Sequence, residues 1–198
     1  MRYFLFVVVH LLPALAVAQS SVSSSTYSSL ENNMGSEAYV ADNLPLFEER
    51  AQQKTSDLFD YFELVVKSNS SKLKGHTWRM IGKQFASDSC RMYSLAVPTT
   101  SMPLSQLLKE KQLPEFWPAS AQTLAFTGMR EALHLTNEGH FEGVLSFSLQ
   151  PKGSYYAATT QHTVGVVIQR STKKFGSSSA NVWEVYLCDV DAPWHATE

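Results

Sequence analysis

Hydrophobic residues between positions 45 and 67 recur at steps of three, four or seven, and this spacing predicts a helix with one apolar stripe. Asp42 or Asn43 can cap the helix, and Pro45 falls in the first turn, where a proline is tolerated. Because an apolar stripe is stabilised by leaving water, we expect it to pack on a sheet of the same domain. A helix that binds a partner is the alternative interpretation.

Alternating hydrophobic and polar residues predict β-strands in much of the remaining chain. The predicted strands or extended segments are 76–86, 91–97, 141–149, 155–169 and 182–190, with a hairpin joining the first two and a serine-rich loop at 171–181. A short helix is predicted from 104 to 113 between two prolines, and 123–135 fits either a helix or a strand. We therefore predict an α+β fold, in which the N-terminal helix packs on an antiparallel sheet of about five strands with one or two inserted short helices.

The first 18 residues have the pattern of a secretory signal peptide. Arg2 precedes an apolar run that ends in Ala16-Val17-Ala18, which matches a small-x-small cleavage site. The run is shorter than the roughly 20 residues that a membrane-spanning helix needs. We therefore predict cleavage before Gln19, no permanent membrane span after cleavage, and export to the periplasm or the extracellular space.

Residues 19–43 are predicted to be a flexible serine-rich tether, because they contain few large apolar side chains. The segment 44–198 is then a single α+β domain. Loss of Arg2 with the signal changes the formal net charge from −2 to −3. This near balance argues against binding to nucleic acid, which usually needs a concentrated basic surface.

Cys90 and Cys188 are the only cysteines, so an exported chain has one intrachain pairing available. Alternation in the segment 182–190 places Cys188 on the strand face opposite Trp183, away from the best apolar surface. We predict a Cys90–Cys188 disulfide, with a free or intermolecularly paired thiol as the alternative. Two cysteines so far apart have no zinc-finger spacing, and we predict neither a metal site nor a cofactor.

Catalytic motifs such as GxSxG, HExxH and a glycine-rich phosphate loop are absent from the sequence. The catalytic candidates are His162 and the pair Asp189 and Asp191. His162 starts an apolar strand face and would lie beside Asp189 if the last two strands pair near that end. His134 and His140 flank a predicted loop and are expected to be structural.

Phe116 and Trp117, bracketed by prolines, are a candidate partner-binding surface because rigid aromatic anchors are common at interfaces. These features favour an exported, non-catalytic binding protein of the cell envelope, such as an inhibitor, an immunity-type protein or an accessory subunit of a surface assembly. The partner would be a protein or an envelope component. The alternatives are a small secreted hydrolase that uses His162 or Asp189 and Asp191, and a eukaryotic secreted glycoprotein modified at the Asn69 sequon.

Overall fold

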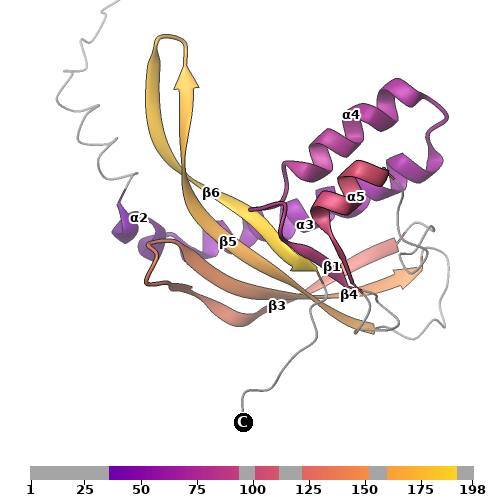
Figure 1. Ribbon diagram of the computed structural model, residues 1–198. Helices are drawn as coiled ribbons and strands as arrows, with labels where there is room; N and C mark the ends of the chain where they lie inside the picture. The colour runs from indigo at the N-terminus through magenta and orange to yellow at the C-terminus, as the bar shows by residue number, and fades with distance from the viewer. Residues whose placement is uncertain (1–35, 94–100, 112–121, 152–159, 191–198) are drawn as a thin grey trace, which may run out of the picture.

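The computed structural model describes residues 36–93, 101–111, 122–151 and 160–190 of the chain (Figure 1). The helices in these ranges are α2 (Glu37–Asp42), α3 (Leu44–Lys67), α4 (Ser71–Gly82) and α5 (Leu104–Glu110). The strands are β1 (Arg91–Tyr93), β2 (Ser101–Pro103), β3 (Gln122–Leu135), β4 (Phe141–Pro151), β5 (Thr160–Phe175) and β6 (Ser178–Val190). The strands form one sheet in the order β2-β1-β6-β5-β4-β3, and the predicted α+β class is confirmed.

The long helix α3 confirms the helix predicted from the apolar stripe, and it lies across one face of the sheet (Figure 1). Phe59 of α3 meets the ring of Phe147 on β4 edge to face, with the ring centroids 5.6 Å apart. The stripe is buried in the domain's own core, as expected, and its buried residues are Phe47, Ala51, Thr55, Leu58, Phe59, Phe62 and Val65.

Helix α4 replaces the first predicted strand, so the prediction for 76–86 was wrong. Ser70 caps the helix, because its side-chain oxygen accepts a hydrogen bond from the Leu73 backbone N–H. Thr77, Trp78 and Ile81 are buried together on one side of the helix, and an alternating pattern does not account for this spacing. Cys90 therefore follows a helix and a loop instead of a hairpin turn.

Within the described residues the sheet has six strands, and one of its pairings is parallel, which differs from the antiparallel sheet of about five strands that the pattern predicted. The short strand β1 runs parallel to β6, with Met92 opposite Val190, whereas the other strand pairings are antiparallel. A parallel bridge between Phe85 and Leu187 extends the same contact toward α4. The segment between α4 and β1 is thereby fastened along the edge of the last strand.

The predicted serine-rich loop at 171–181 is also wrong, because β5 and β6 continue through it to a turn at Gly176. Gly176 has a φ of 63°, a conformation that glycine adopts at little cost. Lys173 and Glu184 form an ion pair of 2.8 Å between the two strands. The resulting β5–β6 hairpin extends beyond the rest of the sheet (Figure 1).

Part of the predicted tether is folded. Residues 37–42 form α2, and Val40 of this helix is fully buried in the core. The Trp183 indole N–H donates a hydrogen bond to the Ser36 carbonyl at 3.1 Å, which fastens the start of α2 to the sheet. The signal peptide and residues 19–35 lie outside the described residues. None of the described helices combines the length and the apolar character needed to cross a membrane.

Candidate functional site

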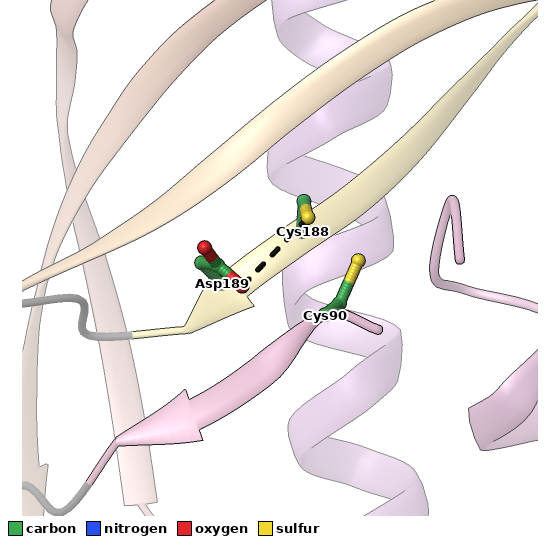
Figure 2. A group of neighbouring side chains, drawn as sticks. All are labelled: Cys90, Cys188 and Asp189. Carbon is green, nitrogen blue, oxygen red and sulfur yellow. Dashed lines mark hydrogen bonds between the residues drawn. The ribbon is translucent and has the colours of Figure 1, made fainter. Parts of the chain in front are cut away.

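Cys90, Cys188 and Asp189 come together where β1 meets β6 (Figure 2). Cys90 precedes β1, and the other two residues lie near the end of β6. Because Met92 is opposite Val190 in the parallel pairing, Cys90 and Cys188 each lie two positions before a residue of that pair. The two sulfur atoms and an Asp189 carboxylate oxygen lie within 4.8 Å of one another. The two cysteines are therefore neighbours, but their sulfur atoms are not at disulfide distance, so the predicted disulfide is not tested by the structure.

An irregularity in β6 brings Asp189 to the same place as Cys188. Successive side chains of a strand normally point to opposite faces. Here the β5–β6 register shifts between Val164 and Gly165, and Asp189 has a φ of 25°. Bulges of this kind commonly redirect a side chain. As a result, the Cys188 thiol donates a weak hydrogen bond to Asp189 Oδ1 over 3.8 Å.

Gly165 makes room for this irregularity. A Cβ atom at this position would lie 3.0 Å from the Cys188 backbone oxygen and 3.3 Å from its carbonyl carbon. On the other side, Asp189 Oδ1 accepts a hydrogen bond of 2.7 Å from the Arg91 backbone N–H. The carboxylate is therefore held by β1, and the site depends on close backbone contact with β5.

The two thiols differ in burial and in acidity. Cys90 is 1% exposed, whereas Cys188 is partly exposed. A hydrogen bond from Cys188 lowers the pKa of Cys90 to about 7, and the same interaction, together with burial, raises the pKa of Cys188. The pair therefore holds its first negative charge on the buried sulfur of Cys90.

A metal site needs at least three histidine, cysteine, aspartate or glutamate side chains close together. Among the described residues, Cys90, Cys188 and Asp189 form the only such group. Two thiolates and a carboxylate suit zinc or a similar soft ion, but they fill only three of the four positions of a structural zinc site. Both cysteines are free thiols in this structure. The disulfide therefore stays a prediction for the oxidised protein.

His162 is buried in the core and does not lie opposite Asp189. It pairs with Phe147 on β4, with ring centroids 5.8 Å apart. Since Val164 is opposite Val190, the position of His162 on β5 extends past the last residue of β6. The His162–Val164–Val166–Ile168 face was predicted correctly, but it packs against the core and not against a catalytic carboxylate.

Other candidates fall outside the described residues, namely Asp191, Phe116 and Trp117. Asn69 is described, and it is exposed in the connection between α3 and α4. Ser70 of the same sequon caps α4, so the sequence N-S-S also has a structural role in starting a helix.

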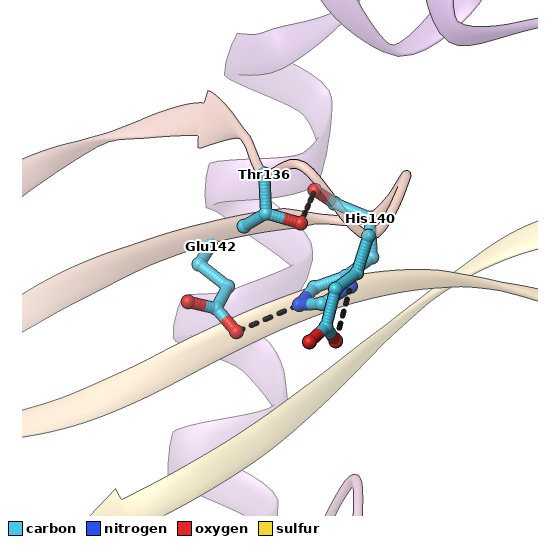
Figure 3. Close-up of polar contacts among 4 residues, drawn as sticks. Thr136, His140 and Glu142 are labelled. Atoms are coloured by element: carbon cyan, nitrogen blue, oxygen red, sulfur yellow. Dashed lines mark hydrogen bonds and ion pairs between the residues drawn. The ribbon is translucent and has the colours of Figure 1, made fainter.

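His140 supports the turn between β3 and β4 (Figure 3). Its Nε2 atom lies 2.7 Å from a Glu142 carboxylate oxygen, and its Nδ1 atom lies 3.9 Å from Glu138. Thr136 donates two hydrogen bonds to the His140 carbonyl, one from its backbone and one from its hydroxyl. The contacts close a turn that Gly139 makes possible with a φ of 78°, so the expected structural role of His140 agrees with its geometry.

A second site is an open groove of about 670 Å³ between α4 and α5. Its lining includes Trp78, which is almost fully buried, and half-buried Leu108, which contributes apolar surface. Its basic residues are all exposed, and they come from α4, from the C-cap of α4 or from the C-cap of α5. They are Lys72, His76, Arg79, Lys83 and Lys111, whereas Asp88 is the only acidic residue among the described residues that line the groove.

The basic side of the groove follows from helix geometry. Lys72, His76, Arg79 and Lys83 are spaced by four, three and four residues, which places them on one face of a helix. The sequence contains no aspartate or glutamate between Glu63 and Asp88, so this face keeps its positive charge. The sequence prediction missed the face because it assigned 76–86 to a strand. The near-neutral total charge concealed the local excess.

Comparison of the chain with known protein families, with curated proteins and with solved structures finds no match in any of the three.

Proposed function

We propose that this chain is an exported, non-catalytic binding protein, and that the groove between α4 and α5 receives an acidic segment of a protein partner. The observation that carries the proposal is the groove itself, an open concave surface with apolar side chains and a rim of four lysine or arginine side chains and one histidine. Export to the periplasm or the extracellular space is proposed from the signal-peptide pattern of residues 1–18.

The chemistry of the groove favours carboxylates on a partner. Arg79 can bind a carboxylate through two parallel hydrogen bonds, and the neighbouring lysines add point charges. Leu108 offers apolar surface for a side chain that accompanies the acidic residues. A peptide that alternates acidic and apolar residues would therefore match both parts of the groove.

Single-stranded nucleic acid is a poorer match for the same surface. Sequence-tolerant binding of single strands combines positive charge with exposed aromatic rings on which bases stack. Trp78 is 3% exposed, so its ring is not available as a stacking platform. The proposal therefore names an acidic protein segment as the partner.

Charge reversal tests this proposal. The double variant Arg79→Glu with Lys83→Glu changes the groove, and Lys109→Glu with Lys174→Glu makes the same change in net charge at exposed positions that do not line it. The probe is a fluorescein-labelled peptide of alternating glutamate and leucine, and its binding is followed by fluorescence anisotropy. We expect about tenfold or greater loss of affinity in the groove variant, near wild-type binding in the control, and weaker binding at high salt.

The proposal also predicts a cellular result. Crosslinking of the native envelope fraction should capture an acidic protein with the wild-type chain and with the control variant, but not with the groove variant. Equal loss in both variants would show that only total charge matters, and equal binding in all three proteins would remove the groove as the binding surface. A matched lysine and leucine peptide that binds as well as the acidic one would overturn the charge argument.

A further inference from the structure

The segment from Gln84 to Cys90 links the two helices of the groove to the last strand of the sheet. On one side, Ala86 donates a backbone hydrogen bond of 2.9 Å to Leu187, and Leu187 donates one of 2.7 Å to Gln84. On the other side, the first residue of α5, Leu104, donates to the Cys90 carbonyl over 2.8 Å. A covalent bond at Cys90 would therefore restrain the position of α5, which borders the groove, relative to the last strand of the sheet.

The two cysteines are placed for such a bond. Neighbouring strands lie about 4.8 Å apart, which falls within the roughly 4.4 to 6.8 Å between Cα atoms that disulfides require. The sulfur atoms are within 4.8 Å of each other, and Figure 2 shows the Cys90 side chain directed toward β6, near Cys188. The two sulfur atoms are not at disulfide distance in this structure, so formation of the bond requires a movement that brings them together.

The difference in burial gives the two sulfurs different roles. An external reagent can reach the partly exposed Cys188, but the Cys90 sulfur is covered and also lies 3.9 Å from the Leu187 carbonyl. We propose that Cys90 and Cys188 are a thiol–disulfide exchange pair, in which Cys188 reacts first with an external disulfide, Cys90 resolves the product, and the new bond staples the α5 side of the domain to β6.

The oxidant is a low-molecular-weight disulfide such as oxidised glutathione. The proton of the Cys188 thiol moves to the Cys90 thiolate, and the Cys188 thiolate formed in this way attacks one glutathione sulfur. The glutathione disulfide breaks, and the glutathione that leaves takes the proton from Cys90, which becomes a thiolate again. The Cys90 thiolate then attacks the Cys188 sulfur and displaces the second glutathione, which takes from the solvent the proton that Cys90 released when it first ionised. Two protein thiols are oxidised to one disulfide, and one glutathione disulfide is reduced to two thiols.

Mass spectrometry of the folded, reduced protein with oxidised glutathione tests the assignment of roles. The wild type should lose two hydrogens and retain no glutathione. Cys90→Ser should accumulate one glutathione on Cys188, because no resolving thiol remains. Cys188→Ser should form an adduct about tenfold more slowly or not at all, since only the buried Cys90 is left. Equal rates for the two variants, or a lasting glutathione adduct on the wild type, would overturn the proposal.

Two further experiments test whether the three residues bind a metal ion instead, and whether the cysteines are paired in the exported protein. Asp189→Asn keeps both thiols, so it should form the disulfide as the wild type does. If Zn²⁺ blocks oxidation until a chelator is added, and Asp189→Asn abolishes that block, then the group is a metal site and the exchange proposal fails. Alkylation of both cysteines in the folded, exported protein without reductant would likewise count against it.

The effect of the disulfide on α5 can be measured without a ligand in the groove. Hydrogen exchange at the Leu104 amide, which bonds to Cys90, should slow when the bond forms, whereas exchange in the β3–β4 turn near Gly139 should not change. Unchanged exchange at Leu104 would contradict the claim that the bond fastens α5. These measurements are independent of the proposed function, so either proposal can fail without the other.

Discussion

Substitution of glycine by alanine should lower the stability of the protein at Gly165 and raise it at Gly75. At Gly165 the added methyl would lie 3.0 Å from the Cys188 backbone oxygen and 3.5 Å from the Cys188 Cβ. The obstacle is mostly backbone that is paired in the sheet, so it cannot rotate away. Overpacking of this kind costs about 1 to 3 kcal/mol.

At Gly75 the added methyl meets nothing within 4 Å, and the residue lies inside α4. Alanine is favoured over glycine in a helix interior by about 1 kcal/mol, so Gly75→Ala should stabilise the protein. For a domain of this size, about 1 kcal/mol corresponds to roughly 2 to 4 °C in Tm. We expect Tm to fall by about 2 to 12 °C for Gly165→Ala and to rise by about 2 to 4 °C for Gly75→Ala.

The assay is thermal unfolding of both variants, reduced, at one pH, with the denaturant midpoint as a second measure. Stability of Gly165→Ala equal to that of the wild type would refute the close approach of β5 to Cys188. Destabilisation by Gly75→Ala would refute the helical assignment of α4, on which the basic face of the groove depends. Because Gly165→Ala displaces the Cys188 backbone, it should also slow disulfide formation, whereas Gly75→Ala should leave the rate unchanged.

Two further predictions concern the core and the β5–β6 hairpin. Phe147 is 0% exposed and contacts the rings of Phe59 and His162. Phe147→Ala should therefore lower the free energy of unfolding, measured by chemical denaturation, by about 3 to 5 kcal/mol. The control is Phe175→Ala, at a side chain that is 63% exposed, which should change the free energy of unfolding by less than about 0.5 kcal/mol. Similar losses in both variants would contradict the placement of α3 on β4. Burial raises the pKa of Glu184, but hydrogen bonds from Lys173, Ser171 and Tyr186 outweigh it and hold that pKa below its usual value. The stabilisation is therefore complete above the unfolded pKa of about 4.3 and is lost as the pH falls through the lower folded pKa. Glu184→Gln should lower the denaturation midpoint at pH 7 but not at a pH below both values, and a difference independent of pH would show that the charge is not responsible.

The sequence alone determined the elements whose side-chain pattern is long or regular. The helix α3 extends over 24 residues, and its stripe has no competing period. In β6 the alternation correctly placed Trp183, Val185 and Leu187 in the core and Cys188 on the other face. In a strand such as β6, burial of one face is enough to fix the register, because a shift of one residue would move every apolar side chain to the exposed face.

Tertiary contacts decided the shorter or ambiguous segments and both candidate sites. Residues 76–86 carry apolar side chains at steps that suit either period, and packing against α3 and α5 selects the helix. Asp189 joins the cysteines only through a register shift opposite Gly165, which has no signature in the local sequence. The basic groove needs α4 to be helical and α5 to lie beside it. The local sequence pattern fixes which face of a helix or strand is buried. Contacts between residues far apart in the chain decide which other element covers that face and which side chains it brings to a site.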